Sequence, residues 1–116
     1  MAVTIYHNPR CSKSRKTLEI IQAAGVDPEI VLYLRDTPPA NDIVALAGKL
    51  GVPVADLLRR GESEFRNATD LPEISDDAAL AAWLVEHPSV LQRPIVVDGD
   101  KAIIGRPPEN VEALLD

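Results

Sequence analysis

The single cysteine, Cys11, lies where the first predicted strand ends and the first predicted helix begins. Unpaired backbone N–H groups and the positive end of the helix dipole favour a thiolate at such a place. Cysteines in these positions can have pKa values of roughly 3.5–7.5. His7 can donate a hydrogen bond to the sulfur, and further positive charge comes from Arg10, Lys13, Arg15 and Lys16. Because its neighbours are polar, we interpret Cys11 as a reactive thiol and not as a buried structural cysteine.

The start of this helix can also bind an anion. Successive N–H groups there can hold a tetrahedral oxyanion beside the nucleophile. The other oxygens of the anion need cations, and arginine supplies bidentate hydrogen bonds. Candidates outside the cysteine loop are Arg59, Arg60, Arg93 and Arg106. Arg93 and Arg106 flank a predicted antiparallel hairpin that brings them side by side, so this pair is the strongest candidate.

The elements that position these residues follow from hydrophobic periodicity and turn residues. Strands are predicted at 3–6 and 29–34 and in a hairpin of 95–97 with 102–104. Helices are predicted at 12–24, from Thr37 to Gly51, at 54–58, after a cap at 75–77, and from Pro107 onward. The apolar run at 29–34 is typical of a strand buried on both faces. The resulting order is βαβ, a helical middle and ββα, and residues 62–72 stay unassigned.

Composition excludes several function classes. The net charge of -6 repels nucleic acid and anionic lipid, and the aromatic content of 3% leaves few platforms for stacking bases. One cysteine allows no intramolecular disulfide, and the first residues are unlike a signal peptide. No apolar run reaches the roughly 20 residues of a membrane span. We therefore expect a cytoplasmic protein with no nucleic-acid or membrane partner, and the spacing of Cys and His predicts no metal site.

Several motifs together resemble those of the glutaredoxin-coupled arsenate reductase family. They are the IYHNPRCSKSR loop, the VLYL strand, and the LLRRGE, QRPIVV and IIGRPPE segments, in this order along nearly the whole chain. The resemblance implies an α/β, thioredoxin-like fold with a four-stranded mixed sheet. It also implies one domain over 1–116, with a helical insertion at about 38–88.

The resemblance assigns roles to particular residues. Cys11 is implied to attack the oxyanion, His7 to stabilise its thiolate and Ser14 to hydrogen-bond it. The anion is implied to bind to three arginines, Arg59, Arg93 and Arg106. A cis peptide bond is implied at Pro94, although cis is the minority state for X–Pro bonds.

The implied reaction is the reduction of arsenate, or of a similar oxyanion, to arsenite through a covalent adduct on Cys11. No second cysteine is present in the chain. Glutathione is therefore the expected co-substrate, and glutaredoxin the partner that resolves the mixed disulfide. No bound cofactor is implied.

Three other readings start from the same cysteine. Cys11–Ser14 is similar to a monothiol glutaredoxin motif, and a protein of that kind would act on glutathione mixed disulfides. That function does not explain the three arginines. A thiol-based regulator of the same fold usually carries a Cys-x-x-Cys switch, which this chain lacks. A cysteine phosphatase needs arginine six positions after the cysteine, where this chain has Thr17.

Overall fold

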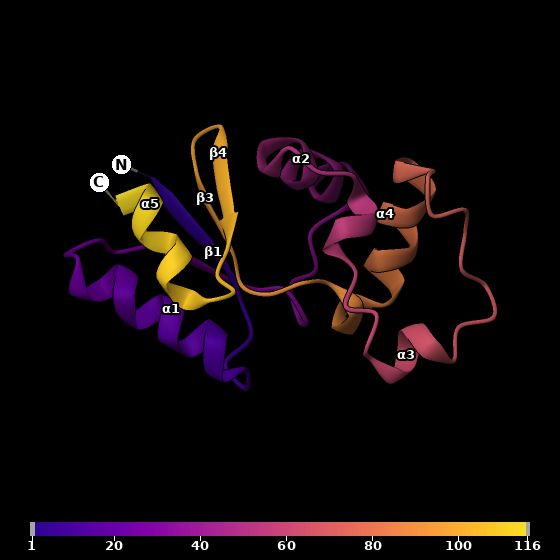
Figure 1. Ribbon diagram of the computed structural model, residues 1–116, viewed down its shortest axis with the longest axis horizontal. Helices are drawn as coiled ribbons and strands as arrows, with labels where there is room; N and C mark the ends of the chain where they lie inside the picture. The colour runs from indigo at the N-terminus through magenta and orange to yellow at the C-terminus, as the bar shows by residue number, and fades with distance from the viewer. Residues whose placement is uncertain (1, 116) are drawn as a thin grey trace. The chain divides into compact units, whose positions relative to one another are not determined.

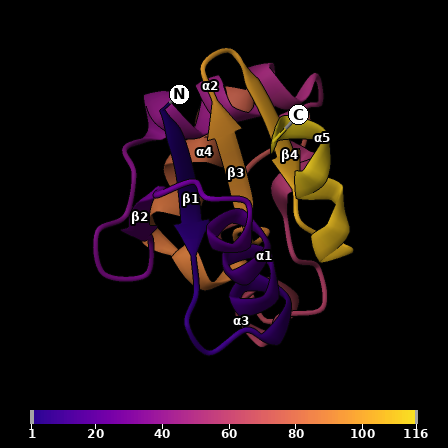
Figure 2. The same ribbon diagram turned by 90° about the vertical axis from the view of Figure 1, so that its left-hand side faces the viewer.

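The computed structural model describes residues 2–115 and contains a mixed four-stranded sheet with strand order β2-β1-β3-β4. Its strands are β1 (Val3–His7), β2 (Glu29–Leu32), β3 (Ile95–Asp98) and β4 (Lys101–Ile104); Figure 1 labels β1, β3 and β4, and Figure 2 labels all four. Strand β1 is parallel to β2 and antiparallel to β3, and β3 and β4 form an antiparallel hairpin. This arrangement confirms the predicted thioredoxin-like α/β fold.

Helices α1 (Ser12–Ala23) and α5 (Glu112–Leu115) cover the same face of this sheet (Figure 2). A 3₁₀ helix, η3 (Pro108–Val111), leads into α5. Side chains on β1 alternate between buried and half-buried, as a strand with one covered face requires. The core between sheet and helices consists of Val3, Ile5, Ile21, Val96, Val111 and Leu114. This core fixes β1 against α1 and therefore fixes the loop between them.

The segment Thr37–Gln92 forms a compact unit of its own, and the described residues before and after it form the other unit. Its elements are α2 (Ala40–Leu50), η1 (Val54–Leu57), α3 (Ser63–Arg66), α4 (Asp77–Glu86) and η2 (Pro88–Val90). The single domain over 1–116 and its helical insertion at about 38–88 both stay predictions. Within residues 2–115, no helix is both long enough and apolar enough to cross a membrane.

Local signals predicted the last turn of α2 and the start of α4, whereas α2 begins at Ala40 and not at Thr37. Helix α2 ends at Gly51, which adopts the left-handed conformation with a φ of 73°, a common way for helices to stop. Helix α4 begins after Asp76, whose carboxylate accepts a hydrogen bond of 3.1 Å from the backbone N–H of Ala79.

The strand predicted over 29–34 is present but shorter, and the expectation that it is buried on both faces was wrong. Strand β2 ends at Leu32 and forms an edge of the sheet, with β1 as its neighbour. Ile30 is 43% exposed and Leu34 is 46% exposed. The chain turns after the strand, because the N–H groups of Arg35 and Asp36 both donate to the carbonyl of Leu32. An apolar run alone does not distinguish a central strand from an edge strand followed by a turn.

Candidate active site around Cys11

A hydrogen-bonded turn between β1 and α1 positions Cys11. The side-chain Oδ1 of Asn8 accepts from the N–H of Arg10 at 3.0 Å, and the Asn8 carbonyl accepts from the N–H of Cys11 at 3.0 Å. Such turns are typical of Asn followed by Pro, here Pro9. The carbonyl of Cys11 then accepts the first helical bond, from Arg15, so Cys11 is the N-cap residue of α1. The sulfur therefore lies at the positive end of the helix.

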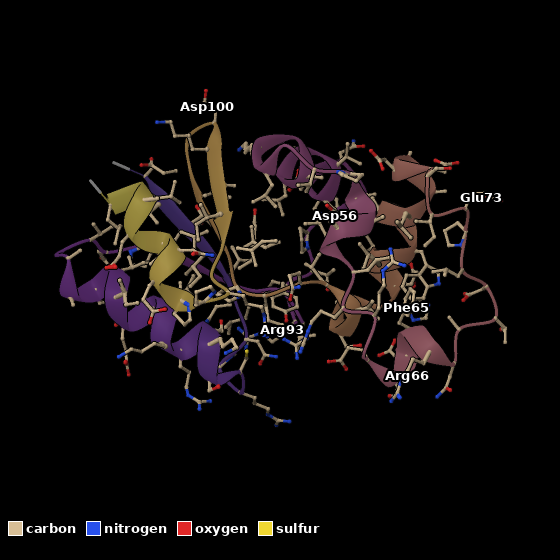
Figure 3. The ribbon with its side chains drawn as sticks, viewed as in Figure 1. Asp56, Phe65, Arg66, Glu73, Arg93 and Asp100 are labelled. Carbon is tan, nitrogen blue, oxygen red and sulfur yellow. The ribbon has the colours of Figure 1, made fainter. Side chains whose placement is uncertain are left out.

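The predicted pairing of Arg93 and Arg106 is confirmed. The Nε of Arg106 donates to the backbone carbonyl of Arg93 at 2.7 Å, and its Nη2 lies 3.5 Å from the Sγ of Cys11. Arg93 lies just before β3, at the start of the hairpin (Figure 3). The peptide bonds Arg93–Pro94 and Arg106–Pro107 are both cis; the resemblance implied the first, and the second was not predicted. Two guanidinium groups next to one sulfur form a strongly cationic site.

The surroundings of Cys11 lower its pKa. Burial raises the pKa of the thiol, but the backbone N–H groups of Ser14 and Lys13, a hydrogen bond from the Arg93 side chain and the charge of Arg106 together outweigh it. The N–H groups of Ser14 and Lys13 point toward the sulfur, but the Cys11 side chain makes no capping hydrogen bond with the helix. Cys11 is partly exposed. A larger fraction of this thiol is therefore ionised and reachable at neutral pH than for an ordinary cysteine.

His7 contacts Ser14 through its Nδ1 nitrogen, at 2.6 Å from Ser14 Oγ, and both side chains are buried. The same oxygen accepts a hydrogen bond of 3.1 Å from the N–H of Asn8. Burial lowers the pKa of His7, and the positive charge of Arg15 lowers it further. His7 is therefore neutral at pH 7 and, with Ser14, ties the first turn of α1 to the end of β1. The roles expected for these two side chains at the sulfur stay predictions.

Tyr33 is a site residue that the sequence did not reveal. It is fully buried just beyond β2, and burial raises the pKa of its hydroxyl. The positive charge of Arg93 and polar interactions with the side chains of Asn8 and Arg93 act in the opposite direction. Tyr33 thus connects the cysteine loop with the arginine that enters β3. Its position inside an apolar run made it look like an ordinary core residue.

Gly105, between β4 and Arg106, lies where two parts of the site approach closely. A Cβ atom on Gly105 would be 2.5 Å from Thr17 Oγ1 on α1 and 2.8 Å from Pro94 Cγ. The N–H of Gly105 donates to the Pro94 carbonyl at 2.9 Å. Neither neighbour moves easily, since Thr17 is fully buried and the ring of Pro94 is rigid. Glycine is therefore required here so that the chain can present Arg106 to Cys11.

We expect Gly105→Ala to lower the free energy of unfolding by about 1–3 kcal/mol, as overpacking in tight cores does. Urea denaturation measures the change. Gly48→Ala is the matched control, because Gly48 is exposed inside α2 and a Cβ there meets nothing within 4 Å. The control should gain up to about 1 kcal/mol from the better helix propensity of alanine. Equal stability of Gly105→Ala and the parent protein would contradict the close approach.

The remaining arginine candidates lie in the helical unit, Thr37–Gln92. The Nη1 of Arg59 donates to Glu62 Oε1 at 3.0 Å, and its backbone N–H donates to the carbonyl of Val90 at 2.7 Å. The guanidinium of Arg60 lies 5.8 Å from the ring centroid of Phe65. The contact of Arg59 with an anion stays a prediction.

Charge is unevenly divided between the two units. The helical unit contains four of the 12 Lys and Arg residues but nine of the 18 Asp and Glu residues, and it therefore carries most of the negative charge. The unit that contains Cys11 is nearly neutral, and its cations include Arg93 and Arg106. Among the described residues, no three His, Cys, Asp or Glu side chains are grouped so that they could hold a metal ion. The chemistry available at this site is that of a thiolate with guanidinium groups around it.

Comparisons with known proteins agree with this geometry. The model of the ArsC family matches residues 6–114. An arsenate reductase of Haemophilus influenzae is 41% identical over 99% of this chain and 100% of its own length. A protein of Escherichia coli named "Uncharacterized protein YfgD" is 44% identical over 94% of this chain and 92% of its own. The solved structure of an arsenate reductase from Vibrio cholerae superimposes with a TM-score of 0.86, at 38% identity and 97% coverage of each chain.

Proposed function

This chain belongs to the ArsC family, and we propose that it reduces arsenate to arsenite with Cys11 as the nucleophile. The contact between Cys11 Sγ and Arg106 Nη2, 3.5 Å apart, is the observation that carries the proposal. A thiolate next to paired arginines suits a tetrahedral dianion, because the cations that stabilise the nucleophile also bind the oxygens of the substrate.

In the first step, arsenate binds to Arg93, Arg106 and the N–H groups at the start of α1, with Arg59 as a third arginine. The Cys11 thiolate attacks arsenic and forms an S–As bond. One As–O bond breaks, and its oxygen leaves as water with the arsenate proton and the proton that the thiol had released. Arsenic is still pentavalent in the adduct.

In the second step, the thiolate of glutathione attacks the sulfur of Cys11. The S–As bond breaks and its electron pair stays on arsenic, which leaves as trivalent arsenite. The two sulfurs are oxidised to a mixed disulfide, and the glutathione proton goes to an arsenite oxygen. Glutaredoxin then takes the glutathionyl group by thiol–disulfide exchange and restores Cys11. Since Cys11 is the only cysteine in the chain, the second sulfur must come from outside.

Three further assignments belong to this proposal. His7 supports the thiolate through Ser14, whose backbone N–H points toward the sulfur. The protein works in the cytoplasm, where the glutathione pool keeps a lone thiol reduced. No bound cofactor takes part in either step.

A coupled assay tests the proposed function. It contains the protein, glutathione, glutaredoxin, glutathione reductase and NADPH, with and without arsenate. We expect NADPH oxidation that depends on arsenate and stops when glutathione is omitted. If Cys11 reacts with iodoacetamide but arsenate adds nothing to the rate, arsenate is not the substrate. Turnover of a glutathione mixed disulfide in the same mixture would then identify a monothiol oxidoreductase.

A further inference from the structure

A cavity of about 250 Å³ lies beside the loop that leads to Cys11. Its lining residues are His7, Asn8, Pro9, Arg10, Leu32, Leu34 and Arg35. The cavity forms where two parallel strands end together, because His7 on β1 is paired with Leu32 on β2. Beyond this pair, β1 continues into the cysteine loop, and β2 continues into the turn at Arg35. The carboxyl ends of parallel strands are the usual place for ligands in α/β sheets.

The cavity combines an apolar wall with cationic side chains. Leu32 and Leu34 supply the apolar wall, and Leu34 is 46% exposed. Arg10 and Arg35 are both exposed. Arg35 lies 3.8 Å from the carboxylate of Asp36, but both side chains are solvated, and exposed pairs of this kind contribute little. The guanidinium of Arg35 can therefore bind another carboxylate.

We propose that this cavity binds one carboxylate-bearing end of glutathione, the thiol co-substrate of the proposed function, on which this inference rests. Glutathione is a tripeptide with two carboxylates, one at each end, and its thiol lies between them. The volume of about 250 Å³ is somewhat smaller than that of pockets that enclose a whole drug-sized ligand. One end of the tripeptide is held between Arg10 and Arg35, and the thiol stays outside.

In this proposal, glutathione held in the cavity reaches past Arg10 to the sulfur of Cys11. Arg10 lines the cavity and is the residue bonded directly to Cys11. Glutathione held there attacks Cys11 of the adduct as written above: an S–S bond forms, the S–As bond breaks, and its electron pair reduces arsenic. Binding of the tripeptide makes this step intramolecular within the complex.

A second cavity, of about 470 Å³, has the wrong charge for this ligand. It lies in the helical unit and is lined by Glu64, Asp70 and His87, among others. His87 is engaged there, because its Nδ1 lies 2.7 Å from Glu64 Oε2. Two carboxylates repel an anionic tripeptide. This cavity therefore serves as an internal control for where glutathione binds.

The direct test is the binding of S-methylglutathione, which keeps both carboxylates but cannot react. Backbone amide shifts in NMR spectra of the full protein report its site. We expect shifts centred on His7–Arg10 and Leu32–Arg35, and Arg35→Glu should weaken binding about fivefold, as the loss of an exposed ion pair of up to about 1 kcal/mol implies. Arg66→Glu makes the same charge change on α3, in the other unit, and is the matched control; it should bind like the parent (Figure 3). The diethyl ester of S-methylglutathione, which lacks the carboxylates, should bind more weakly.

Shifts confined to the cavity at Glu64 and Asp70, or equal binding by Arg35→Glu and Arg66→Glu, would overturn the proposal. In the coupled assay, Arg35→Glu should raise the KM for glutathione about fivefold. An equal loss in the rate of arsenite formation, measured directly with 2-mercaptoethanol as the thiol, would mean that the substitution damages Cys11 and would also overturn the proposal, because this thiol has no carboxylate. If the proposed function itself is wrong, a different result is expected. Arsenate, added without any thiol, would then not protect Cys11 from alkylation by iodoacetamide.

Discussion

Cys11→Ser is expected to abolish arsenate-dependent NADPH oxidation, with a loss of at least about 10³-fold, as removal of an enzyme nucleophile does. A serine hydroxyl stays protonated at neutral pH even where Arg93 and Arg106 lower the pKa of a thiol, so it cannot attack arsenic. It also cannot form the mixed disulfide on which the second step depends. The coupled assay measures this loss, and mass spectrometry after incubation with arsenate and glutathione should find no glutathionylated protein.

The fold should survive this substitution, because Cys11 is partly exposed and the core cluster behind α1 does not include it. The amide spectrum should therefore resemble that of the parent protein, with a Tm within a few degrees. Residual activity above about one tenth of the parent rate, in a folded Cys11→Ser protein, is incompatible with nucleophilic catalysis at this residue.

Arg106→Lys is expected to lower kcat/KM for arsenate about 10²-fold, the scale of losing one preorganised donor to a developing charge. Lysine keeps the positive charge but cannot donate to the Arg93 carbonyl and reach Cys11 Sγ at the same time, as the Arg106 guanidinium does at 2.7 Å and 3.5 Å. Steady-state kinetics at saturating glutathione measure the loss. Arg66→Lys, an exposed site on α3, is the matched control and should change kcat/KM by less than about twofold.

A second substitution at the same position separates charge from geometry. Arg106→Ala removes a positive charge that lowers the pKa of Cys11, so that pKa must rise. Because the thiolate is the form that reacts, the midpoint of the pH dependence of iodoacetamide alkylation should move to higher pH. In Arg106→Lys, the midpoint should move less than in Arg106→Ala, while kcat/KM still falls. If both variants keep the parent kcat/KM, Arg106 does not bind the oxyanion.

Much of the fold follows from local signals in the sequence. The left-handed glycine Gly51 and the capping carboxylate Asp76 marked helix ends where the structure has them. The turn between β3 and β4 predicted the pairing of these strands, and that pairing places Arg93 next to Arg106. The reactive position of Cys11 likewise depends on its immediate neighbours, since the Asn8 turn makes it the N-cap of α1.

Other features depend on contacts between distant segments, and the sequence could not reveal them. The exposure of Ile30 follows from the position of β2 at an edge of the sheet, which is decided by the order of all four strands. Tyr33 interacts with Arg93, which lies 60 residues later in the chain. Glycine is needed at position 105 because Thr17, on helix α1, lies too close for a Cβ atom. No periodicity within one element encodes such contacts.

The position of Cys11 at the start of α1 also bears on how this protein can be improved in the laboratory. Helices are best begun by serine, threonine, aspartate or asparagine, and here the sulfur completes no capping hydrogen bond. A screen of variants for thermal stability alone would therefore select those four residues at position 11, and each of them would abolish the activity. Thermostability and activity compete for one side chain, so a screen for durable variants has to hold Cys11 fixed or select for turnover at the same time.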